Sequence, residues 1–185
     1  MNRPVSAHWL ITGASGFLGR SAVANALKAG HRVTAVVRYR DSEAFQREMN
    51  RLHPEHCRRL QLAVQDLRAS ATPEFEAALT RCDGVLHLAA AKSGDFAAQF
   101  AGTVRATERL LAAIAGADVP RLVLISSFSV YDYRQLAAGD LLDENAPLLG
   151  PFLASPDDGG EVSRRDIEAQ YRGRDAYAVC KRMQE

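Results

Sequence analysis

The sequence predicts an α/β fold in which helices cover both faces of a parallel sheet. Short apolar runs rich in β-branched residues alternate with segments of helical periodicity along the 185-residue chain. The first run ends in three glycines spaced three apart, Gly13, Gly16 and Gly19, and a helical pattern follows directly. A strand, a turn, a helix and a second strand within about thirty residues indicate the right-handed βαβ unit.

Composition and charge are those of an ordinary globular protein, with 47% apolar and 24% charged residues. The net charge of +1 gives no electrostatic case for binding nucleic acid or a membrane surface. No apolar run approaches the roughly 18 residues of a membrane span, and residues 1–11 lack the features of a signal peptide. Cys57, Cys82 and Cys180 have neither paired nor metal-type spacing, so we expect reduced thiols, no metal site and a cytoplasmic protein.

The glycine turn has the chemistry of a dinucleotide site. Glycine has no Cβ, so the turn can bring backbone N–H groups close to a ligand. The N-terminus of the following helix offers unpaired N–H groups and a partial positive charge to a pyrophosphate. The spacing is a variant of the dinucleotide fingerprint, with one more residue between the first two glycines. A tight loop that binds nothing is the alternative.

Residues 31–38 predict the second strand, and Arg38 at its end bears on the choice of cofactor. The residue at this point of the fold faces the adenosine ribose. An acidic residue there accepts from the 2′-hydroxyl of NAD, whereas an arginine, here followed closely by Arg40, favours the 2′-phosphate of NADP. We therefore expect NADP to be preferred over NAD. A solvated strand-end charge, or one that stacks on the adenine without selecting the cofactor, is the alternative.

The next segments continue the alternation of helix and strand. Residues 42–52 predict a helix capped by Ser42, residues 60–64 a third strand, and Pro73 opens a short helix through Leu79. Asp66, just after the third strand, can accept from the adenine amino group. Its alternative role is only to cap or end the strand.

A fourth strand is expected over residues 83–91, which are apolar enough to be buried on both faces of the sheet. It ends in three alanines, whose small side chains let the backbone approach a flat ring or a ribose. Simple core packing is the alternative. We expect His87, inside this strand, to be a hydrogen-bonded core residue rather than a ligand.

The second half of the chain begins with a long helix over residues 95–116 and a fifth strand over 120–125. The strand runs into a cluster of hydroxyls that includes Ser127, at the sheet edge where open α/β folds bind ligands. Residues 132–174 are the least regular part, with a short helix expected at 161–171. A loop of this length is either a lid or a mobile insertion.

The last segment predicts a helix that begins after Asp175 as its N-cap and carries Tyr177 and Lys181. Residues four apart lie on one helical face, one turn from each other. An ammonium beside a phenol favours the phenolate form, so this tyrosine could act as a general acid or base near neutral pH. The chain ends four residues after Lys181, inside this helix.

Together these segments resemble the extended short-chain dehydrogenase/reductase family, which includes nucleotide-sugar epimerases and dihydroflavonol-type reductases. The matching motifs, in family order over residues 8–185, are Thr12–Gly19, Asp66-Leu67, His87–Ala90, Ser126–Tyr131, Asp143-Glu144 with Pro147, and Tyr177–Lys181. The resemblance implies a Rossmann-like doubly wound sheet of strand order 3-2-1-4-5. It also implies one NAD(P)-binding domain over 1–185, with an irregular insertion at about 132–174. Family members continue with a small carboxyl-terminal substrate domain, which we expect to be missing from this chain.

The resemblance also assigns roles by position. Tyr177 would be the catalytic acid/base, Lys181 would bind the nicotinamide ribose and support the tyrosine, and Ser127 would hydrogen-bond the substrate carbonyl or hydroxyl. The residues implied for cofactor binding are Gly13, Ser15, Gly16, Phe17, Leu18, Gly19, Arg38, Asp66, Leu67, Leu88, Ala89, Ala90 and Lys181. The implied activity is hydride transfer between NADP or NAD and a carbonyl or secondary alcohol, with a nucleotide sugar as a candidate substrate. Reductase and epimerase remain open, and a homodimer is the implied assembly.

Three departures from the family pattern qualify these expectations. Thr103 stands where the family often has asparagine, and Phe128 and Ser129 stand where dehydratases carry an acidic pair, which argues against sugar dehydration. The 50 residues from Ser127 to Tyr177 are more than is usual. A non-catalytic NADP(H)-binding sensor on the same fold is the alternative function. The intact serine, tyrosine and lysine favour the enzyme.

Overall fold

The computed structural model describes residues 6–150 and 175–185. These residues divide into two compact units, one formed by residues 6–89 with 106–125 and the other by 90–105 with 126–150 and 175–185. We call the first the sheet unit and the second the tyrosine unit, after the helix that carries Tyr177. The expectation of a single domain over residues 1–185 stays a prediction.

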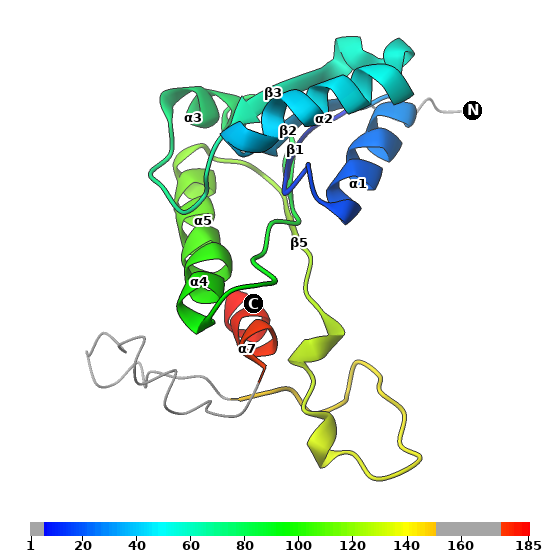
Figure 1. The fold of residues 1–185 in the computed structure, drawn as a ribbon, viewed down its shortest axis with the longest axis vertical. Coiled ribbons are helices and arrows are strands. Elements are labelled where there is room, and N and C mark those ends of the chain that lie inside the picture. Colours follow the sequence, from blue (N-terminus) through cyan, green and yellow to red (C-terminus); the bar gives the residue numbers. More distant parts are fainter. Residues whose placement is uncertain (1–5, 151–174) are drawn as a thin grey trace. The chain divides into compact units, whose positions relative to one another are not determined.

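The sheet unit contains a five-stranded parallel sheet of order β3-β2-β1-β4-β5 (Figure 1). Its strands are β1 (His8–Thr12), β2 (Arg32–Val37), β3 (Leu60–Val64), β4 (Gly84–His87) and β5 (Leu122–Leu124). The predicted strand order is confirmed, and all four neighbouring pairs are parallel. The fourth strand is shorter than expected because the chain leaves the ladder after His87, where the Ala89 N–H donates to the Thr12 hydroxyl at 3.3 Å.

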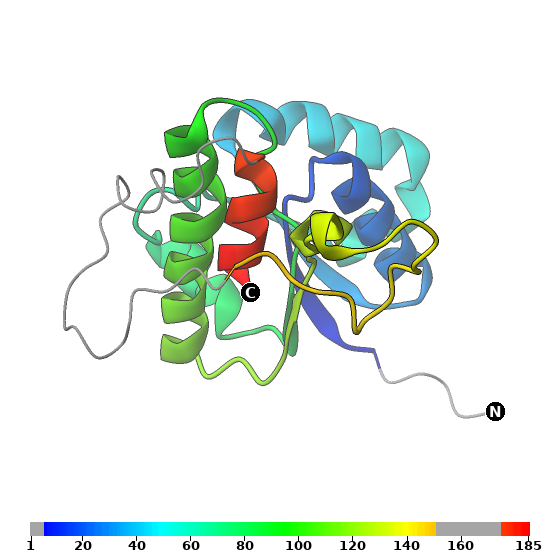
Figure 2. The ribbon, with the colours of Figure 1, turned by 90° about the horizontal axis from the view of Figure 1, so that it is seen from below.

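Helices α1 (Phe17–Lys28) and α2 (Tyr39–Leu52) cover one face of the sheet. The buried residues between them and the strands are Ile11, Ala14, Val23, Leu27, Val33, Ala35, Val37, Phe45 and Met49. Helices α3 (Pro73–Leu79) and α5 (Ala106–Gly116) cover the other face. The core on that face contains Leu10, Val36, Ala63, Phe75, Ala78, Leu79, Cys82, Val85, Leu110 and Ile114. Figure 2 shows α5 in green and α1 with α2 in blue and cyan on opposite sides of the strands, as the doubly wound prediction requires.

Helix α2 begins earlier than the sequence suggested. Its N-cap is Arg38, and the predicted cap, Ser42, lies inside the first turn, where its hydroxyl donates to the Tyr39 carbonyl at 2.7 Å. Serine can satisfy its hydroxyl in this way within a helix, so it is not tied to the cap position. A 3-10 helix that was not expected, η1 (Pro54–Arg59), then leads into β3.

The tyrosine unit is built around α4 (Phe96–Phe100), the π-helical segment η2 (Ala101–Arg105) and α7 (Ala176–Gln184). Phe100, Val104 and Cys180 form its buried cluster, against which Phe96 and Met183 pack. Two short 3-10 helices follow the fifth strand, η3 (Phe128–Val130) and η4 (Tyr133–Gln135). The helix expected at 161–171 lies outside the described residues.

None of the described helices is long and apolar enough to cross a membrane. The three cysteines are free thiols, and Cys82 and Cys180 are buried. Burial raises the pKa of the Cys180 thiol to about 12 and also raises the pKa of Cys82, so both stay protonated near neutral pH. We assign these two cysteines to packing rather than to chemistry.

Candidate functional site

The turn between β1 and α1 requires glycine at two positions. Gly13 has φ +66°, and a Cβ on it would lie 2.8 Å from the Ala89 nitrogen. A Cβ on Gly19 would collide with the Gly13 carbonyl and lie 2.7 Å from the Ala14 Cα. The first turn of α1 therefore lies directly against the backbone of the loop, as expected for a turn that holds a ligand with main-chain groups.

The N-terminus of α1 carries no side-chain cap. Its N-cap is Gly16, whose backbone is extended and whose N–H donates to the Gly13 carbonyl at 2.9 Å. Phe17 and Leu18 follow, with 89% and 53% of their surfaces exposed. A helix that begins without a capping side chain leaves its first N–H groups to solvent or to an anion. This is the feature of the sheet unit that best fits the predicted pyrophosphate site.

Buried hydrogen bonds link β1, which leads into the glycine turn, to β4 and α5. His87 is 1% exposed, with Nδ1 2.6 Å from the Thr12 hydroxyl and Nε2 2.9 Å from the Thr107 hydroxyl. The expectation of a core histidine is confirmed. Thr107 was missed from the sequence because it lies on α5, twenty residues further along the chain. The Thr12 hydroxyl also accepts from the Ala89 N–H, so these hydrogen bonds fix the loop after β4 beside Gly13.

Arg38 lies at the carboxyl end of β2 and forms an ion pair with Asp41, at 2.8 Å from Nη2 and 2.9 Å from Nε. The same Asp41 oxygen lies 3.5 Å from the hydroxyl of Ser15 in the glycine turn. The structure therefore brings Ser15 and Arg38 together around one carboxylate. Asp41 was missed from the sequence, since it was expected to precede the helix rather than to lie in its first turn.

A second contact ties the glycine turn to α2. The Arg20 guanidinium donates from Nε to the Ser15 carbonyl at 2.8 Å and forms an ion pair with Glu48. Arg20 belongs to α1 and Glu48 to α2, so the pair links both helices on this face to the turn. Neither residue was singled out from the sequence, because neither belongs to the motif.

Asp66 is held by Arg68 at the end of β3. The Arg68 N–H donates to one carboxylate oxygen at 2.9 Å, and its guanidinium reaches the other at 2.6 Å. These hydrogen bonds lower the pKa of Asp66 to about 2. The contacts agree with the role of ending the strand. A carboxylate has further lone pairs, so the adenine role stays a prediction.

The remaining candidates near the strand ends are apolar. Leu67 packs against the core under α3 and α5, and Leu88 against the core under α1 and α2. Ala89 lies against Gly13, while Ala90 belongs to the tyrosine unit and is half-buried. The structure gives the two leucines a packing role, and their contact with a cofactor remains a prediction.

In the tyrosine unit, α7 has the N-cap that the sequence predicts. The Asp175 carboxylate accepts from the Tyr177 N–H at 3.0 Å. Lys181, one turn after Tyr177, is 3% exposed and directs its ammonium to the Gln184 side chain. Burial lowers the pKa of Lys181, with Glu185 acting in the opposite direction and Lys92 adding to the shift. Tyr177 is half-buried, and its hydroxyl forms no hydrogen bond within the described part of the chain.

Two further hydroxyls of this unit bear on the expected chemistry. Ser127 is the N-cap of η3, and its Oγ accepts from the Ser129 N–H at 3.2 Å and lies 3.2 Å from the Ser129 hydroxyl. Thr103 is fully buried in the π-helical segment, where its hydroxyl accepts from the Ala91 N–H at 3.0 Å. Among residues 6–150 and 175–185, no hydrogen bond joins Ser127 to Tyr177. Their common role rests on the resemblance.

The family model that matches is the NAD dependent epimerase/dehydratase family, over residues 9–185. The chain belongs to this family. UDP-glucose 4-epimerase 2 of Oryza sativa subsp. japonica is 33% identical over 128 residues, which cover 66% of this chain and 31% of the relative. The resemblance found in the sequence is thereby confirmed.

Solved structures agree with the fold. MoeE5 in complex with UDP-glucuronic acid and NAD is 30% identical, with a TM-score of 0.52 over 67% of this chain and 38% of that one. A short-chain dehydrogenase/reductase superfamily protein from Agrobacterium tumefaciens with bound NAD is 23% identical, with a TM-score of 0.61 over 96% of this chain and 42% of that one. At 23% identity the second likeness shows the fold alone. The chain spans less than half the length of each of these proteins.

Proposed function

We propose that this chain holds the pyrophosphate of a nicotinamide dinucleotide on the glycine turn and the N-terminus of α1. The observation that carries the proposal is the start of α1, whose N-cap Gly16 offers no side chain and whose Gly19 lies directly against Gly13. Backbone N–H groups and the positive end of the helix are the natural partners of a diphosphate. Membership of the NAD dependent epimerase/dehydratase family supports the same ligand.

We propose further that the whole protein is an NAD(P)-dependent oxidoreductase or epimerase that acts on a carbonyl or secondary alcohol. The first substrates to test are UDP-sugars, because a UDP-glucose epimerase is among its relatives and MoeE5 is solved with UDP-glucuronic acid. The bound cofactor supplies the hydride acceptor and donor. The protein supplies position and proton transfer.

In this mechanism the tyrosine unit handles the proton. Tyr177 takes the proton from the substrate hydroxyl when the carbon is oxidised and returns it when the carbonyl is reduced. Lys181 keeps a cation one helical turn away and supports the phenolate. Ser127 donates its hydroxyl hydrogen to the substrate oxygen, which requires only that it rotate away from Ser129.

We also propose that Arg38 favours NADP over NAD. Its side chain is 49% exposed at the strand end, and a guanidinium can hold a phosphate with two hydrogen bonds. Binding the 2′-phosphate has to compete with the existing ion pair to Asp41. The preference is therefore modest, and NAD remains a usable cofactor.

Titration with NADPH and NADH, followed by cofactor fluorescence, tests the binding site. Tighter binding of NADPH, lost in Arg38→Ala, supports both the site and the preference. Equal binding of the two removes the preference, and failure of both to bind overturns the site.

Turnover of UDP-sugars by Tyr177→Phe tests the enzyme. We expect activity to fall at least about 100-fold while cofactor binding is retained, because general acid–base catalysis contributes about 10²–10⁴-fold. Tyr133→Phe, an exposed tyrosine of the same unit, is the matched control and should be unchanged. Unchanged turnover in Tyr177→Phe would remove Tyr177 as the acid/base, and no turnover by the wild type would instead favour the non-catalytic NADP(H) sensor.

A further inference from the structure

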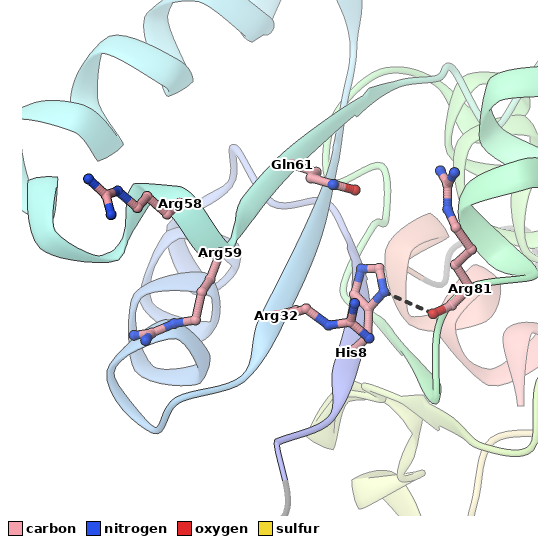
Figure 3. A pocket seen from close by; sticks show the side chains of 6 residues that line it. All are labelled: His8, Arg32, Arg58, Arg59, Gln61 and Arg81. Carbon is pink, nitrogen blue, oxygen red and sulfur yellow. Dashed lines mark hydrogen bonds between the residues drawn. The ribbon is translucent and has the colours of Figure 1, made fainter.

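A basic pocket lies at the end of the sheet opposite to the glycine turn. It is lined by His8, Arg32, Arg58, Arg59, Gln61 and Arg81, and its volume is about 150 Å³ (Figure 3). All six residues belong to the sheet unit. They lie in or just before the strands β1 to β4, at their amino ends. In the proposed function, the cofactor does not bind at the amino ends of the strands.

The register of the sheet builds the pocket. His8 pairs with Arg32 across β1 and β2, and Thr34 pairs with Gln61 across β2 and β3. Paired residues of parallel strands and residues two apart on one strand share a face. His8, Arg32, Thr34 and Gln61 therefore lie on the same face of the sheet. Arg81 joins them because its carbonyl lies 2.9 Å from His8 Nδ1.

His8 lines the pocket and is held in place by hydrogen bonds, and it does not supply the positive charge of the pocket. Its ring is 2.8 Å from the Thr34 hydroxyl through Nε2 and is 4% exposed. Burial lowers the pKa of His8, and the Arg32 and Arg81 cations lower it further, whereas the hydrogen bond to the Arg81 carbonyl and the charge of Asp83 raise it. The positive charge of the pocket is thus carried by its arginines.

All four arginines have unused donors among the described residues. Within the described residues, the guanidinium groups of Arg32, Arg58 and Arg81 form neither a hydrogen bond nor an ion pair. Arg59 donates from Nη2 to the Leu27 carbonyl at 2.7 Å, while its buried Nε has no partner there. Figure 3 shows the Arg32 guanidinium beside His8, and Gln61 on the neighbouring strand.

Among the described residues that line the pocket, none carries a carboxylate to balance these charges. The carboxylate of Asp83 accepts from the His8 main-chain N–H at 2.7 Å. Glu55 lies 3.2 Å from His56 on η1. Like charges gathered without counter-charges destabilise the free fold, and a bound anion would relieve that cost.

We propose that this pocket is a second ligand site, which binds the phosphate or diphosphate group of a small molecule. Guanidinium groups match phosphate oxygens with paired, charge-assisted hydrogen bonds. The pocket has room for several water molecules and hence for one or two phosphate groups, with the rest of the ligand in solvent. Arg32 lies beside His8, Arg81 adds a guanidinium from the segment before β4, and Arg58 adds positive charge from η1.

The test is the binding of inorganic pyrophosphate by calorimetry and thermal unfolding, in saturating NAD so that the glycine turn is not the site measured. We expect pyrophosphate to raise the melting temperature of the wild type and to bind less tightly as salt increases. Arg32→Gln and Arg81→Gln should each raise the dissociation constant for pyrophosphate by about tenfold or more, and the double variant should not bind it. Equal binding by all variants, or none by the wild type, would overturn the proposal.

The matched control is Arg121→Gln. Arg121 is exposed and directly precedes β5, so it lies at the same edge of the sheet but does not line the pocket. It should bind pyrophosphate like the wild type. A merely structural role for the pocket arginines predicts lower melting temperatures for their variants without ligand, whereas relief of repulsion predicts equal or higher ones.

A second arm identifies the source of the phosphate. If a nucleoside diphosphate binds more tightly than pyrophosphate, and Arg32→Gln weakens it, the pocket recognises a nucleotide. If the two bind equally, the phosphate groups alone are recognised. If pyrophosphate binding disappears in Gly13→Ala but survives in Arg32→Gln, the ligand binds at the glycine turn. That outcome contradicts the second site.

Discussion

The two ends of the parallel sheet hold charge in opposite ways. At the carboxyl end, Arg38 is paired with Asp41, and Asp66 with Arg68, so the charged side chains bind one another. The groups left open are backbone N–H groups at the start of α1. At the amino end the side chains of Arg32 and its neighbours are themselves the open donors, among the described residues. We therefore propose main-chain binding of a diphosphate at the carboxyl end and side-chain binding of a phosphate group at the amino end.

The direction of the chain explains part of this difference. Each helix of a βαβ unit starts at the carboxyl end of the sheet and finishes at the amino end. Helix C-termini favour basic residues, and the last turns of α1 and α2 carry Lys28 and Arg51. Arg81, two residues after α3, fits the same rule. Arg32 does not, since it begins a strand, and it is the residue that concentrates charge at His8.

The largest loss of stability and of cofactor affinity is expected at the carboxyl end of the sheet, where the glycine turn has no room for a side chain. Gly19→Ala places a methyl group against the Gly13 carbonyl and the Ala14 backbone, which a helix packed on a tight turn cannot avoid. We expect a loss of about 3 kcal/mol in the free energy of unfolding and a loss of roughly 100-fold in NAD(H) affinity, measured by denaturation and by fluorescence titration.

The control is Gly116→Ala at the end of α5, where an added Cβ meets nothing within 4 Å. That variant should be neutral or gain up to about 0.5–1 kcal/mol, because alanine is the better helix residue. A Gly19→Ala protein that binds NADH like Gly116→Ala would show that the close approach at the turn does not matter.

At the amino end, the next effect is expected from His8. His8→Leu removes the ring that bonds Thr34 and the Arg81 carbonyl, and we expect a loss of about 1–3 kcal/mol of stability at pH 7. Because burial lowers the pKa of His8 in the fold, the unfolded chain takes up the proton more readily. Wild-type stability should therefore fall as the pH drops below about 6.5, the ordinary histidine value. The Arg32 and Arg81 cations add to this loss, whereas the hydrogen bond to the Arg81 carbonyl and the charge of Asp83 oppose it.

Urea denaturation from pH 8 to pH 5 measures this effect. The difference in stability between wild type and His8→Leu should shrink as the pH falls, since only the wild type loses the contribution of a neutral His8. A difference that stays constant over that range would assign the cost to packing alone.

The same contrast decides what could be predicted from sequence. The glycine turn was predictable because its three glycines lie within seven residues, between an apolar strand and a helical pattern. The start of α3 was predictable for a similar reason. Thr72 caps that helix by accepting from the Phe75 N–H, and Pro73 follows at its first position. In these cases the physical cause is local in the chain.

The missed features all depend on residues that are distant in sequence. His8 and Arg81 are 73 residues apart, and only the register of β1, β2 and β4 brings them beside Arg32. The contact of Ser15 with Asp41 requires both the glycine turn and a helix that begins three residues earlier than its serine suggested. Neither arrangement has a signature in composition or spacing.

A smaller effect is expected from the charge pair beside the glycine turn. Asp41→Asn frees the Arg38 guanidinium and removes a negative charge near Ser15, so NADPH affinity should rise by a few-fold. NADH affinity should change less. Fluorescence titration of both cofactors gives the ratio, and Glu43→Gln, an exposed acid of the same helix, is the control. An unchanged ratio would mean that Arg38 does not face the 2′-position.

The smallest effect is expected at Asp66, because its pair with Arg68 is largely exposed. Exposed ion pairs contribute about 0–1 kcal/mol, so Arg68→Ala should cost no more than that at pH 7. The pKa of Asp66 is lowered to about 2, and the stabilisation that this represents is present above the ordinary aspartate value near 4 and is lost as the pH falls toward 2. The free energies of unfolding of Arg68→Ala and the wild type, measured as the pH is lowered, should therefore differ least at pH 2.

An NMR titration should find the Asp66 pKa higher in Arg68→Ala than in the wild type. A carboxylate freed from Arg68 in this way is better able to accept from an adenine amino group. If NADH binds more tightly to Arg68→Ala, the ion pair competes with the cofactor for Asp66. Unchanged affinity leaves Asp66 with the structural role that its contacts already show.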